Sequence, residues 1–253
     1  MQQSIAGGGL TSRVAIVTGG GSGIGEEVVR TLERDGARAY VLDRVPAPHD
    51  ARAARWKQAD VTDPDAVSEA VGEVEGAEGG VDILVNCAGY NSFSAPEALD
   101  VEGWRRIVAV NLDGTYHACL AVIPGMMRRR SGRIVNIGSS ASLLAIPHAV
   151  AYTAAKHAVV GLTRALALDL GPYGITVNCV CPGSTLTPLL AQAVSENFRA
   201  MMTERTPLRR LGLPSDIASA IAFLASPQAA WISGVALPVD GGMVAGSRSV
   251  HWE

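Results

Sequence analysis

The chain alternates short apolar runs with longer segments in which apolar residues recur every three or four positions. Short apolar runs bounded by turn residues are typical of buried strands, and the longer period indicates helices with one buried face. The runs predict strands near residues 14–18, 38–42, 56–58, 82–86, 133–138, 175–180 and 235–239. The periodic segments predict helices near residues 23–35, 64–76, 102–130, 152–170 and 214–225.

This alternation of strands and helices favours an α/β fold, with a parallel sheet covered by helices on both faces. Prolines and glycines support several of the predicted helix ends. Pro64 and Pro214 suit the first turn of a helix, and Gly171-Pro172 ends the helix that precedes it. Two prolines within residues 44–55 make a crossover helix unfavourable there, so we expect a loop or one irregular turn.

Length and composition suit one large domain, because 253 residues with 48% hydrophobic composition can bury a full core. No linker divides the chain, so residues 13–253 are expected to form a single domain after a flexible tail at residues 1–12. The net charge is −3, and the charges are scattered except for the triplet at residues 128–130. We interpret that triplet as cations at a helix C-terminus, and we expect no nucleic-acid partner.

The chain carries no recognisable targeting segment, since residues 1–9 are polar and rich in glycine. No uninterrupted apolar stretch is long enough to span a bilayer, so no membrane contact is expected. The four cysteines lie in apolar segments and are interpreted as buried thiols in a reducing cytoplasm. Neither the cysteines nor the five histidines have the spacing of a metal site, and none is expected.

The first predicted strand leads directly into a glycine-rich turn at residues 18–25, which opens the first predicted helix. Such a turn gathers free backbone N–H groups and the positive end of a helix, where a pyrophosphate can bind. Glycines at positions 19, 23 and 25 would allow a tight turn and a close approach of the ligand. A glycine run alone is a weak signal, but the strand and helix on either side strengthen it.

The second predicted strand ends at Asp43, whose carboxylate could accept hydrogen bonds from the ribose hydroxyls of adenosine. The same carboxylate would repel a 2′-phosphate. Ser22, inside the glycine turn, is neutral where a phosphate-binding site would gain from a cation. Both residues favour NAD over NADP. Arg44 could approach a phosphate, but we interpret it as a solvated loop charge.

Tyr152 and Lys156 lie one turn apart on a predicted helix, which brings the phenol and the ammonium to one face. A cation beside a phenol lowers the phenol pKa from its usual value of about 10. Lowering it to near neutrality requires about 4 kcal/mol, and the phenol could then exchange a proton with an alcohol or ketone. Taken alone, such a pair is also common on helix surfaces, where it is worth only tenths of a kcal/mol.

Together these motifs resemble the short-chain dehydrogenase/reductase family, from about Arg13 to about Gly242. The matching motifs are Thr18-Gly19 with Gly23 and Gly25, Asp60-Val61, Asn86-Cys87-Ala88-Gly89 (with cysteine where asparagine is usual), Val110-Asn111-Leu112, Ser139, Tyr152 with Lys156, Pro182-Gly183 with Thr187, and Val239-Asp240-Gly241-Gly242. The resemblance implies a single doubly wound Rossmann-type domain with seven parallel strands in the order 3-2-1-4-5-6-7. It also implies an NAD-dependent oxidoreductase that acts on a secondary alcohol or ketone.

By this resemblance the catalytic residues are Asn111, Ser139, Tyr152 and Lys156. Tyr152 would be the general acid/base and Ser139 would orient the substrate oxygen. Lys156 would hold the nicotinamide ribose and lower the tyrosine pKa, and Asn111 would hold a water in a proton relay. Ser140 is an alternative to Ser139 as the serine that orients the substrate oxygen. Neighbouring side chains alternate along a strand, so only one of the two can face the tyrosine.

The remaining expected contacts concern the cofactor and the substrate. The predicted NAD-binding residues are Gly19, Ser22, Gly23, Ile24, Gly25, Asp43, Asp60, Val61, Asn86, Ala88, Gly89, Tyr152, Lys156, Pro182, Gly183, Thr185 and Thr187. The predicted substrate pocket contains Tyr90, Ser140, Leu144, His148 and Leu189, and suits a small to medium alcohol or ketone that is apolar or cyclic. Residues 183–207 are expected to form a lid over this pocket or, alternatively, a small helix packed on the core.

Two expectations concern assembly and activity. Apolar residues at helical spacing in residues 102–130 and 152–170, with the family resemblance, favour a homotetramer built on a four-helix contact. An alternative to an enzyme is an NAD-binding redox sensor or scaffold with the same fold and little turnover. A methyltransferase also uses a glycine turn but has no need for Ser139, Tyr152 and Lys156 together.

Overall fold

The computed structural model of the chain describes residues 9–48, 55–187 and 195–246, in which seven strands form one parallel sheet. The strand order is β3-β2-β1-β4-β5-β6-β7, which confirms the predicted doubly wound topology. The strands are β1 (Val14–Thr18), β2 (Arg38–Asp43), β3 (Trp56–Gln58), β4 (Ile83–Asn86), β5 (Gly132–Ile137), β6 (Ile175–Pro182) and β7 (Ala236–Val239). Every pairing between neighbouring strands is parallel.

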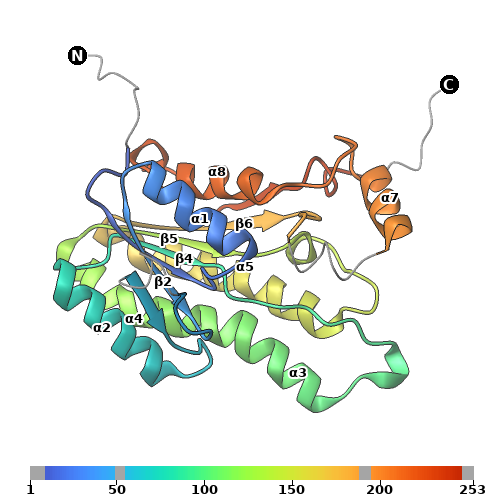
Figure 1. The fold of residues 1–253 in the computed structure, drawn as a ribbon, viewed down its shortest axis with the longest axis horizontal. Coiled ribbons are helices and arrows are strands. Elements are labelled where there is room, and N and C mark those ends of the chain that lie inside the picture. Colours follow the sequence, from blue (N-terminus) through green and yellow to red (C-terminus); the bar gives the residue numbers. More distant parts are fainter. Residues whose placement is uncertain (1–8, 49–54, 188–194, 247–253) are drawn as a thin grey trace.

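Helices cover both faces of the sheet, as Figure 1 shows: α1 and α8 lie on one face, and α2, α4 and α5 lie on the other. The helices are α1 (Gly23–Arg34), α2 (Pro64–Glu78), α3 (Val101–Val108), α4 (Gly114–Arg129), α5 (Val150–Leu170), α7 (Glu196–Arg205) and α8 (Pro214–Ala225). The predicted boundaries differ from these mostly by one or two residues, the usual uncertainty at helix and strand ends.

The strands read as continuous apolar runs because they are buried on both faces. In β1, Ala15 and Val17 pack in the core beneath α1 and α8, whereas Val14 and Ile16 pack in the core beneath α2 and α4. Alternate side chains of a strand point to opposite faces, so a parallel sheet between two helical layers requires apolar residues at nearly every position. The strands therefore bring their carboxyl ends to one edge, where ligands bind in folds of this type.

The predicted helix over residues 102–130 is interrupted by a π-helical segment at Ala109–Asp113. Within it, the Asn111 side-chain amide donates a hydrogen bond to the Ile107 carbonyl oxygen, at 3.0 Å, and a second one to the Tyr90 carbonyl oxygen, at 2.9 Å. A side chain that takes a helix carbonyl in this way disturbs the regular backbone ladder. Wide turns of this kind occur often at functional sites.

The N-terminal boundary differs from the expected one. Residues 1–8 lie outside the described part of the chain, but Leu10 is buried in the core with α1 and α8, and Arg13 donates its backbone N–H to the Leu10 carbonyl. The domain therefore includes residues before position 13, contrary to the predicted tail through residue 12. The segment between β2 and β3 is without a helix at residues 44–48, and residues 49–54 are likewise not described.

Two arginines of the basic triplet at residues 128–130 make contacts within the domain. Arg129 bonds to the Val81 carbonyl and pairs with Glu75, and Arg130 bonds to the Pro172 carbonyl and lies over the Tyr173 ring. These contacts lie at the C-terminal end of α4, in agreement with the interpretation of the triplet as cations at a helix C-terminus.

One described helical stretch, Val101–Arg129, is long and apolar enough to cross a bilayer by length and composition, with a mean hydropathy of 1.3. The sequence contains no uninterrupted apolar span there, since charged residues flank and punctuate the stretch. Core helices pass the same test, and α4 packs against α2, β4 and β5. This single helix is therefore weak support for a membrane span.

Candidate active site

The glycine turn after β1 lies directly against the loop that follows β4. Gly19 has φ = +64°, and a Cβ atom there would lie 2.8 Å from the Ala88 Cα atom, so only glycine suits this position. Ser22 is the N-cap of α1, but its side chain does not accept a hydrogen bond from the first turn of the helix. The N–H groups of that turn therefore lack a capping side chain. The predicted residues Gly19, Ser22, Gly23, Ile24, Gly25 and Ala88 thus come together around the start of α1. This arrangement can receive a pyrophosphate.

Asp43 ends β2 beside this turn. Its Oδ2 atom accepts a hydrogen bond from the Gly21 N–H at 3.0 Å, and its Oδ1 atom accepts one from the Val45 N–H at 3.2 Å. Both bonds hold the carboxylate at the position where an adenosine ribose would lie. Arg44 lies near another carboxylate, because it contributes to the lowered pKa of Asp60.

Asp60 and Val61, two of the predicted NAD-binding residues, follow β3. The Asp60 carboxylate accepts hydrogen bonds from the backbone and the side chain of Thr62, and the backbone bond is the main cause of its lowered pKa. Val61 is buried against Gly114, and its carbonyl lies 2.9 Å from His117 Nδ1. Both predicted residues therefore reach the same edge of the sheet as Asp43.

The side chain of Asn86 is buried between the sheet and α4. Its side chain is 2% exposed and donates hydrogen bonds to Asn136 Oδ1 at 2.9 Å and to Cys119 Sγ at 3.4 Å. Asn136 in turn donates to Thr163 Oγ1 at 2.9 Å, which links β4, β5 and α5 through buried polar groups. The Asn86 side chain therefore points into the protein interior, and a contact between Asn86 and the cofactor stays a prediction.

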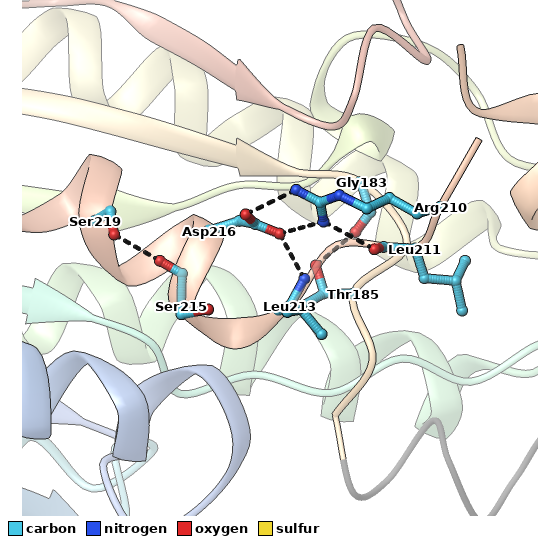
Figure 2. Close-up of polar contacts among 8 residues, drawn as sticks. All are labelled: Gly183, Thr185, Arg210, Leu211, Leu213, Ser215, Asp216 and Ser219. Atoms are coloured by element: carbon cyan, nitrogen blue, oxygen red, sulfur yellow. Dashed lines mark hydrogen bonds and ion pairs between the residues drawn. The ribbon is translucent and has the colours of Figure 1, made fainter. Parts of the chain in front are cut away.

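The residues after β6 lie close to the glycine turn that opens α1. Thr187 Cγ2 would lie 3.4 Å from a Cβ atom on Gly23, so this segment passes in front of the glycine turn. Figure 2 shows Gly183 and Thr185, which are joined by a hydrogen bond of 3.1 Å from Thr185 Oγ1, next to the start of α8. Thr185 also forms a parallel bridge with Gly212. The predicted segment Pro182, Gly183, Thr185 and Thr187 is thus fixed at the carboxyl edge of the sheet.

An ion pair fixes the segment that lies opposite Thr185. Arg210 forms two hydrogen bonds to the Asp216 carboxylate, at 2.6 and 2.9 Å, and Asp216 also accepts one from the Leu213 N–H (Figure 2). These bonds lower the pKa of Asp216, with the Arg210 hydrogen bond as the largest cause. They fix residues 210–213 at the N-terminus of α8, and with them Gly212 opposite Thr185.

Tyr152 and Lys156 occupy the first turns of α5, and the Lys156 Nζ atom lies 5.7 Å from the centre of the Tyr152 ring. Lys156 is 4% exposed and donates a hydrogen bond to the Ile137 carbonyl at 2.8 Å. Burial lowers the pKa of its ammonium to about 8, against smaller opposing effects of the neighbouring Cys179, Cys87 and Cys181. The three thiols therefore surround the lysine, a feature that the sequence did not indicate.

The pKa of Tyr152 differs from the expectation. Burial of the phenol raises its pKa, a hydrogen bond with the Ser139 side chain lowers it by less, and nearby Cys181 raises it further. The predicted lowering toward neutrality by Lys156 is therefore not found in this structure, because desolvation outweighs the effects that favour the phenolate. Among the two candidate serines, Ser139 rather than Ser140 is the one that affects the phenol, so its side chain is the one near the tyrosine.

Asn111 presents an unsatisfied acceptor to the same region. Its side chain is fully buried, and its Oδ1 atom has no hydrogen-bond partner among the described residues. A Cβ atom on Gly89 would lie 2.7 Å from this oxygen and 3.6 Å from Lys156 Nζ, so both polar groups flank Gly89. Buried acceptors are rarely left unpaired. A water or a ligand hydroxyl between Asn111 and Lys156 would satisfy it.

The predicted substrate pocket is brought together only in part. Tyr90 and His148 are exposed and Leu144 is half-buried, whereas Ser140 is buried and Leu189 lies outside the described residues. The loops after β4 and β5 are joined by a hydrogen bond of 2.8 Å from the Ser94 N–H to the His148 carbonyl. The predicted lid contains helix α7, but its role stays a prediction.

The sequence analysis missed Ser142. Its hydroxyl group accepts a hydrogen bond from the Ser139 N–H at 3.1 Å and donates one to the Lys156 carbonyl at 2.8 Å. The Ser-x-x-Ser spacing from position 139 was the signal that could have indicated it, because it resembles a capping box. Within the described ranges, no group of three or more His, Cys, Asp or Glu side chains could hold a metal ion.

Comparisons with known proteins agree on the type of chain. A family model described as enoyl-(acyl carrier protein) reductase matches residues 19–244. The chain is 39% identical to 2-(S)-hydroxypropyl-CoM dehydrogenase 3 of Xanthobacter autotrophicus over 93% of its own length and 98% of the relative. It is 42% identical to the inactive 2-(S)-hydroxypropyl-CoM dehydrogenase 2 of the same organism, over 86% of this chain and 100% of the relative. Ligand-free aldohexose dehydrogenase of Thermoplasma acidophilum superimposes with a TM-score of 0.91 at 35% identity, covering 98% of this chain and 100% of that one.

Proposed function

This chain belongs to the short-chain dehydrogenase/reductase family, and from that premise we propose that it is an NAD-dependent enzyme that interconverts a secondary alcohol and its ketone. The observation that carries the proposal is the position of buried Lys156, whose ammonium lies 5.7 Å from the Tyr152 ring, with Ser139 near the same phenol. A proton donor, a second polar group and a buried cation at one edge of the sheet suit a reaction at a C–O bond.

The described residues fit an NAD molecule. The uncapped start of α1 would hold the pyrophosphate, and Asp43 would accept hydrogen bonds from the adenosine ribose. Lys156 and the unpartnered Asn111 oxygen lie on either side of Gly89, where a ribose hydroxyl or a water would find both a donor and an acceptor. When bound, the nicotinamide ring would supply or accept the hydride.

The protein side chains would move the proton and orient the substrate. Because burial raises the pKa of Tyr152, its phenol is held in the protonated form, which can donate to a ketone oxygen. Ser139 would donate a hydrogen bond to the same oxygen and fix its position. Lys156, with the acceptor Asn111, would return a proton to the tyrosine through the space beside Gly89.

The substrate class follows from the relatives and the loops around the site. Further relatives carry the names of dehydrogenases of other hydroxyl compounds, including cyclic and open-chain ones. The loop after β4 presents Tyr90 and Phe93 at the surface, and its Ser94 N–H bonds to the His148 carbonyl just before α5. A small to medium secondary alcohol, apolar or cyclic, suits these walls.

A panel of secondary alcohols and ketones tests the proposal, with NADH absorbance as the measurement. We expect turnover with at least one member and with NAD(H). The alternative, a sensor or scaffold with little turnover, has some support because a relative of 42% identity is named inactive. This chain retains Ser139, Tyr152 and Lys156. Tight NADH binding without turnover across the whole panel would favour the alternative.

The cofactor assignment predicts a change of preference in Asp43→Ala. The wild type is expected to bind NADH at least about tenfold more tightly than NADPH, and the variant to narrow or reverse that ratio, because it loses the ribose contact and the charge that repels a 2′-phosphate. Calorimetry of both dinucleotides measures this. Asp35→Ala, a surface carboxylate at the end of α1, is the control and should leave the ratio unchanged. Equal wild-type affinities would contradict the assignment.

The assembly is proposed to be a homotetramer, with α4 and α5 of two subunits forming a four-helix contact. Tyr116, Leu120 and Leu168 lie exposed on these helices, Leu168 at 80%. Exposed apolar side chains on neighbouring helices suit a subunit interface. We expect sedimentation equilibrium at micromolar concentration to give about four times the 26.3 kDa chain mass. A mass of one chain would contradict this proposal and leave the catalytic assignment standing.

All four cysteines are free thiols, and three of them are fully buried. Free thiols persist in a reducing compartment. We therefore propose a cytoplasmic location.

A further inference from the structure

One buried hydroxyl group connects the two elements that carry the catalytic side chains. Ser142 ends the short 3-10 turn Ser140–Ser142, which directly follows Ser139 at the end of β5. Its Oγ atom accepts a hydrogen bond from the Ser139 N–H and donates one to the Lys156 carbonyl in α5. At 4% exposure, Ser142 has no surface from which to contact a substrate. Its contacts are with the backbones of two predicted catalytic residues.

The local backbone is arranged around this hydroxyl. Ser139 Oγ accepts a hydrogen bond from the Ala141 N–H at 3.1 Å, while Ser142 Oγ accepts from the Ser139 N–H, so the two serines form a reciprocal capping box. The capping box sets both the backbone direction at Ser139 and the side from which its hydroxyl approaches Tyr152. Removing the Ser142 hydroxyl breaks one half of it.

The packing leaves little room for a substitute. A Cβ atom on Gly138 would lie 2.8 Å from Ser142 Oγ, 2.8 Å from Cys179 Sγ and 2.9 Å from Cys181 Sγ, so the turn lies directly on the two sulfur atoms. The Ser142 hydroxyl accepts the Ser139 N–H in this tight setting, and a thiol sulfur would be only a weak substitute acceptor. Without the Ser142 hydroxyl, the Ser139 N–H would therefore lose its hydrogen-bond partner.

We propose that Ser142 is a positioning residue that fixes the Ser139 hydroxyl relative to the Tyr152 phenol, because it ties the turn after β5 to α5. The inference rests on the proposed function for its kinetic consequences, but its geometry is independent of turnover. A shift of about 1 Å in a catalytic group can cost about 100-fold in rate. The hydroxyl is thus expected to act on kcat through Ser139 rather than on cofactor binding.

Thr163 offers a matched control. Its buried hydroxyl also joins β5 to α5, because it accepts a hydrogen bond from Asn136 Nδ2 at 2.9 Å and donates one to the Val159 carbonyl at 2.8 Å. It lies further along α5, away from Tyr152 and Lys156. Thr163→Val therefore also removes two hydrogen bonds of a buried hydroxyl, one to β5 and one within α5, without touching Ser139.

The test compares Ser142→Ala with Thr163→Val in the full-length protein. Both are expected to lower Tm by about 2–8 °C. Ser142→Ala should lower kcat by about 10- to 100-fold, with KM and the NADH dissociation constant within about threefold of the wild type. Thr163→Val should keep kcat within about threefold. Equal kcat in the two variants would overturn the proposal.

A double-mutant cycle tests whether the effect passes through Ser139. In a Ser139→Ala background, adding Ser142→Ala should change kcat by less than about threefold, because the hydroxyl that it positions is already gone. A further loss of about tenfold or more would show that Ser142 acts by another route and would overturn the proposal.

A crystal structure of Ser142→Ala decides the geometry even if no alcohol in the panel is turned over. We expect the Ser139 hydroxyl to move away from the Tyr152 oxygen by about 1 Å or more relative to the wild type. An unchanged Ser139–Tyr152 distance would overturn the inference. Absence of turnover in the wild type would count against the proposed function alone, since the crystal structure does not depend on it.

Discussion

Replacing Tyr152 with phenylalanine is expected to lower kcat by about 10²–10⁴-fold, the range found for a general acid/base. The substitution deletes the transferable proton and keeps the ring. Lys156 retains its hydrogen bond to the Ile137 carbonyl, and the glycine turn and Asp43 are untouched. The NADH dissociation constant should therefore stay within about threefold of the wild type. Initial rates on the best alcohol and fluorescence titration with NADH measure the two quantities.

Tyr173→Phe is the matched control for this substitution. Tyr173 follows the far end of α5, where its ring lies 5.7 Å from the Arg130 guanidinium, and removing its hydroxyl should leave kcat unchanged. If Tyr152→Phe kept more than about a hundredth of the wild-type activity, the phenol would not be the proton donor. Loss of NADH binding together with activity would instead indicate a folding defect, which the thermal melt of the same sample would reveal.

The fold could be predicted in detail because its physical requirements are local. A parallel sheet between two helical layers demands apolar residues on both faces of every strand, and the run Val14–Val17 meets that demand directly. Helix starts were marked by Pro64 and Pro214, which begin α2 and α8 as expected. The positions of Asp43 and of the glycine turn could also be predicted, because each lies at the end of a strand that the apolar pattern marks.

What the sequence could not supply were the contacts between distant segments. The π-helical segment at Asn111 depends on a bond to the Tyr90 carbonyl, which lies in a different loop. Asn86 belongs to a motif that suggested a ligand contact, but its pairing with Asn136 across two strands turns the side chain inward. The direction in which an amide points is decided by its partner, and the partner is remote in sequence.

The pKa of Tyr152 is a second example. The spacing of Tyr152 and Lys156 indicated that a cation would favour the phenolate, and the distance of 5.7 Å between ammonium and ring agrees with their shared face. Burial of the phenol acts in the opposite direction and is the larger effect. The extent of burial depends on the whole fold, so helical spacing alone gave the wrong sign. Burial also changes the pKa of Lys156, which it lowers.

Lys156→Met is expected to impair both binding and turnover while stabilising the fold at neutral pH. The variant loses the ammonium that would contact the nicotinamide ribose, so the NADH dissociation constant should rise about tenfold or more and kcat should fall by at least about 100-fold. The free energy of unfolding should nevertheless increase, because methionine fills the same buried space without a charge. Tenfold weaker NADH binding together with a raised Tm would be the signature of a buried functional cation.

The pH dependence of this stabilisation follows from the lowered pKa. In the folded protein the pKa of Lys156 is lowered from 10.5 to about 8 by burial. Below about pH 8 both folded and unfolded chains carry the charge, and the folded chain bears the full cost of burying it. Between about pH 8 and 10.5 the folded chain has released the proton while the unfolded chain keeps it, so stability rises with pH and the cost disappears.

The advantage of Lys156→Met over the wild type should therefore shrink by about 3 kcal/mol between pH 7 and pH 10.5, at 1.36 kcal/mol per pH unit. Urea unfolding of both proteins at several pH values measures this difference, in which the titration of the other groups largely cancels. The other lysine of the chain, Lys57, is paired with Glu73 near the surface, so Lys57→Met should show no comparable trend. If the difference in free energy of unfolding between Lys156→Met and the wild type stayed constant with pH, the Lys156 ammonium would not be desolvated. That result would contradict the argument that this cation is held in the site for its chemistry.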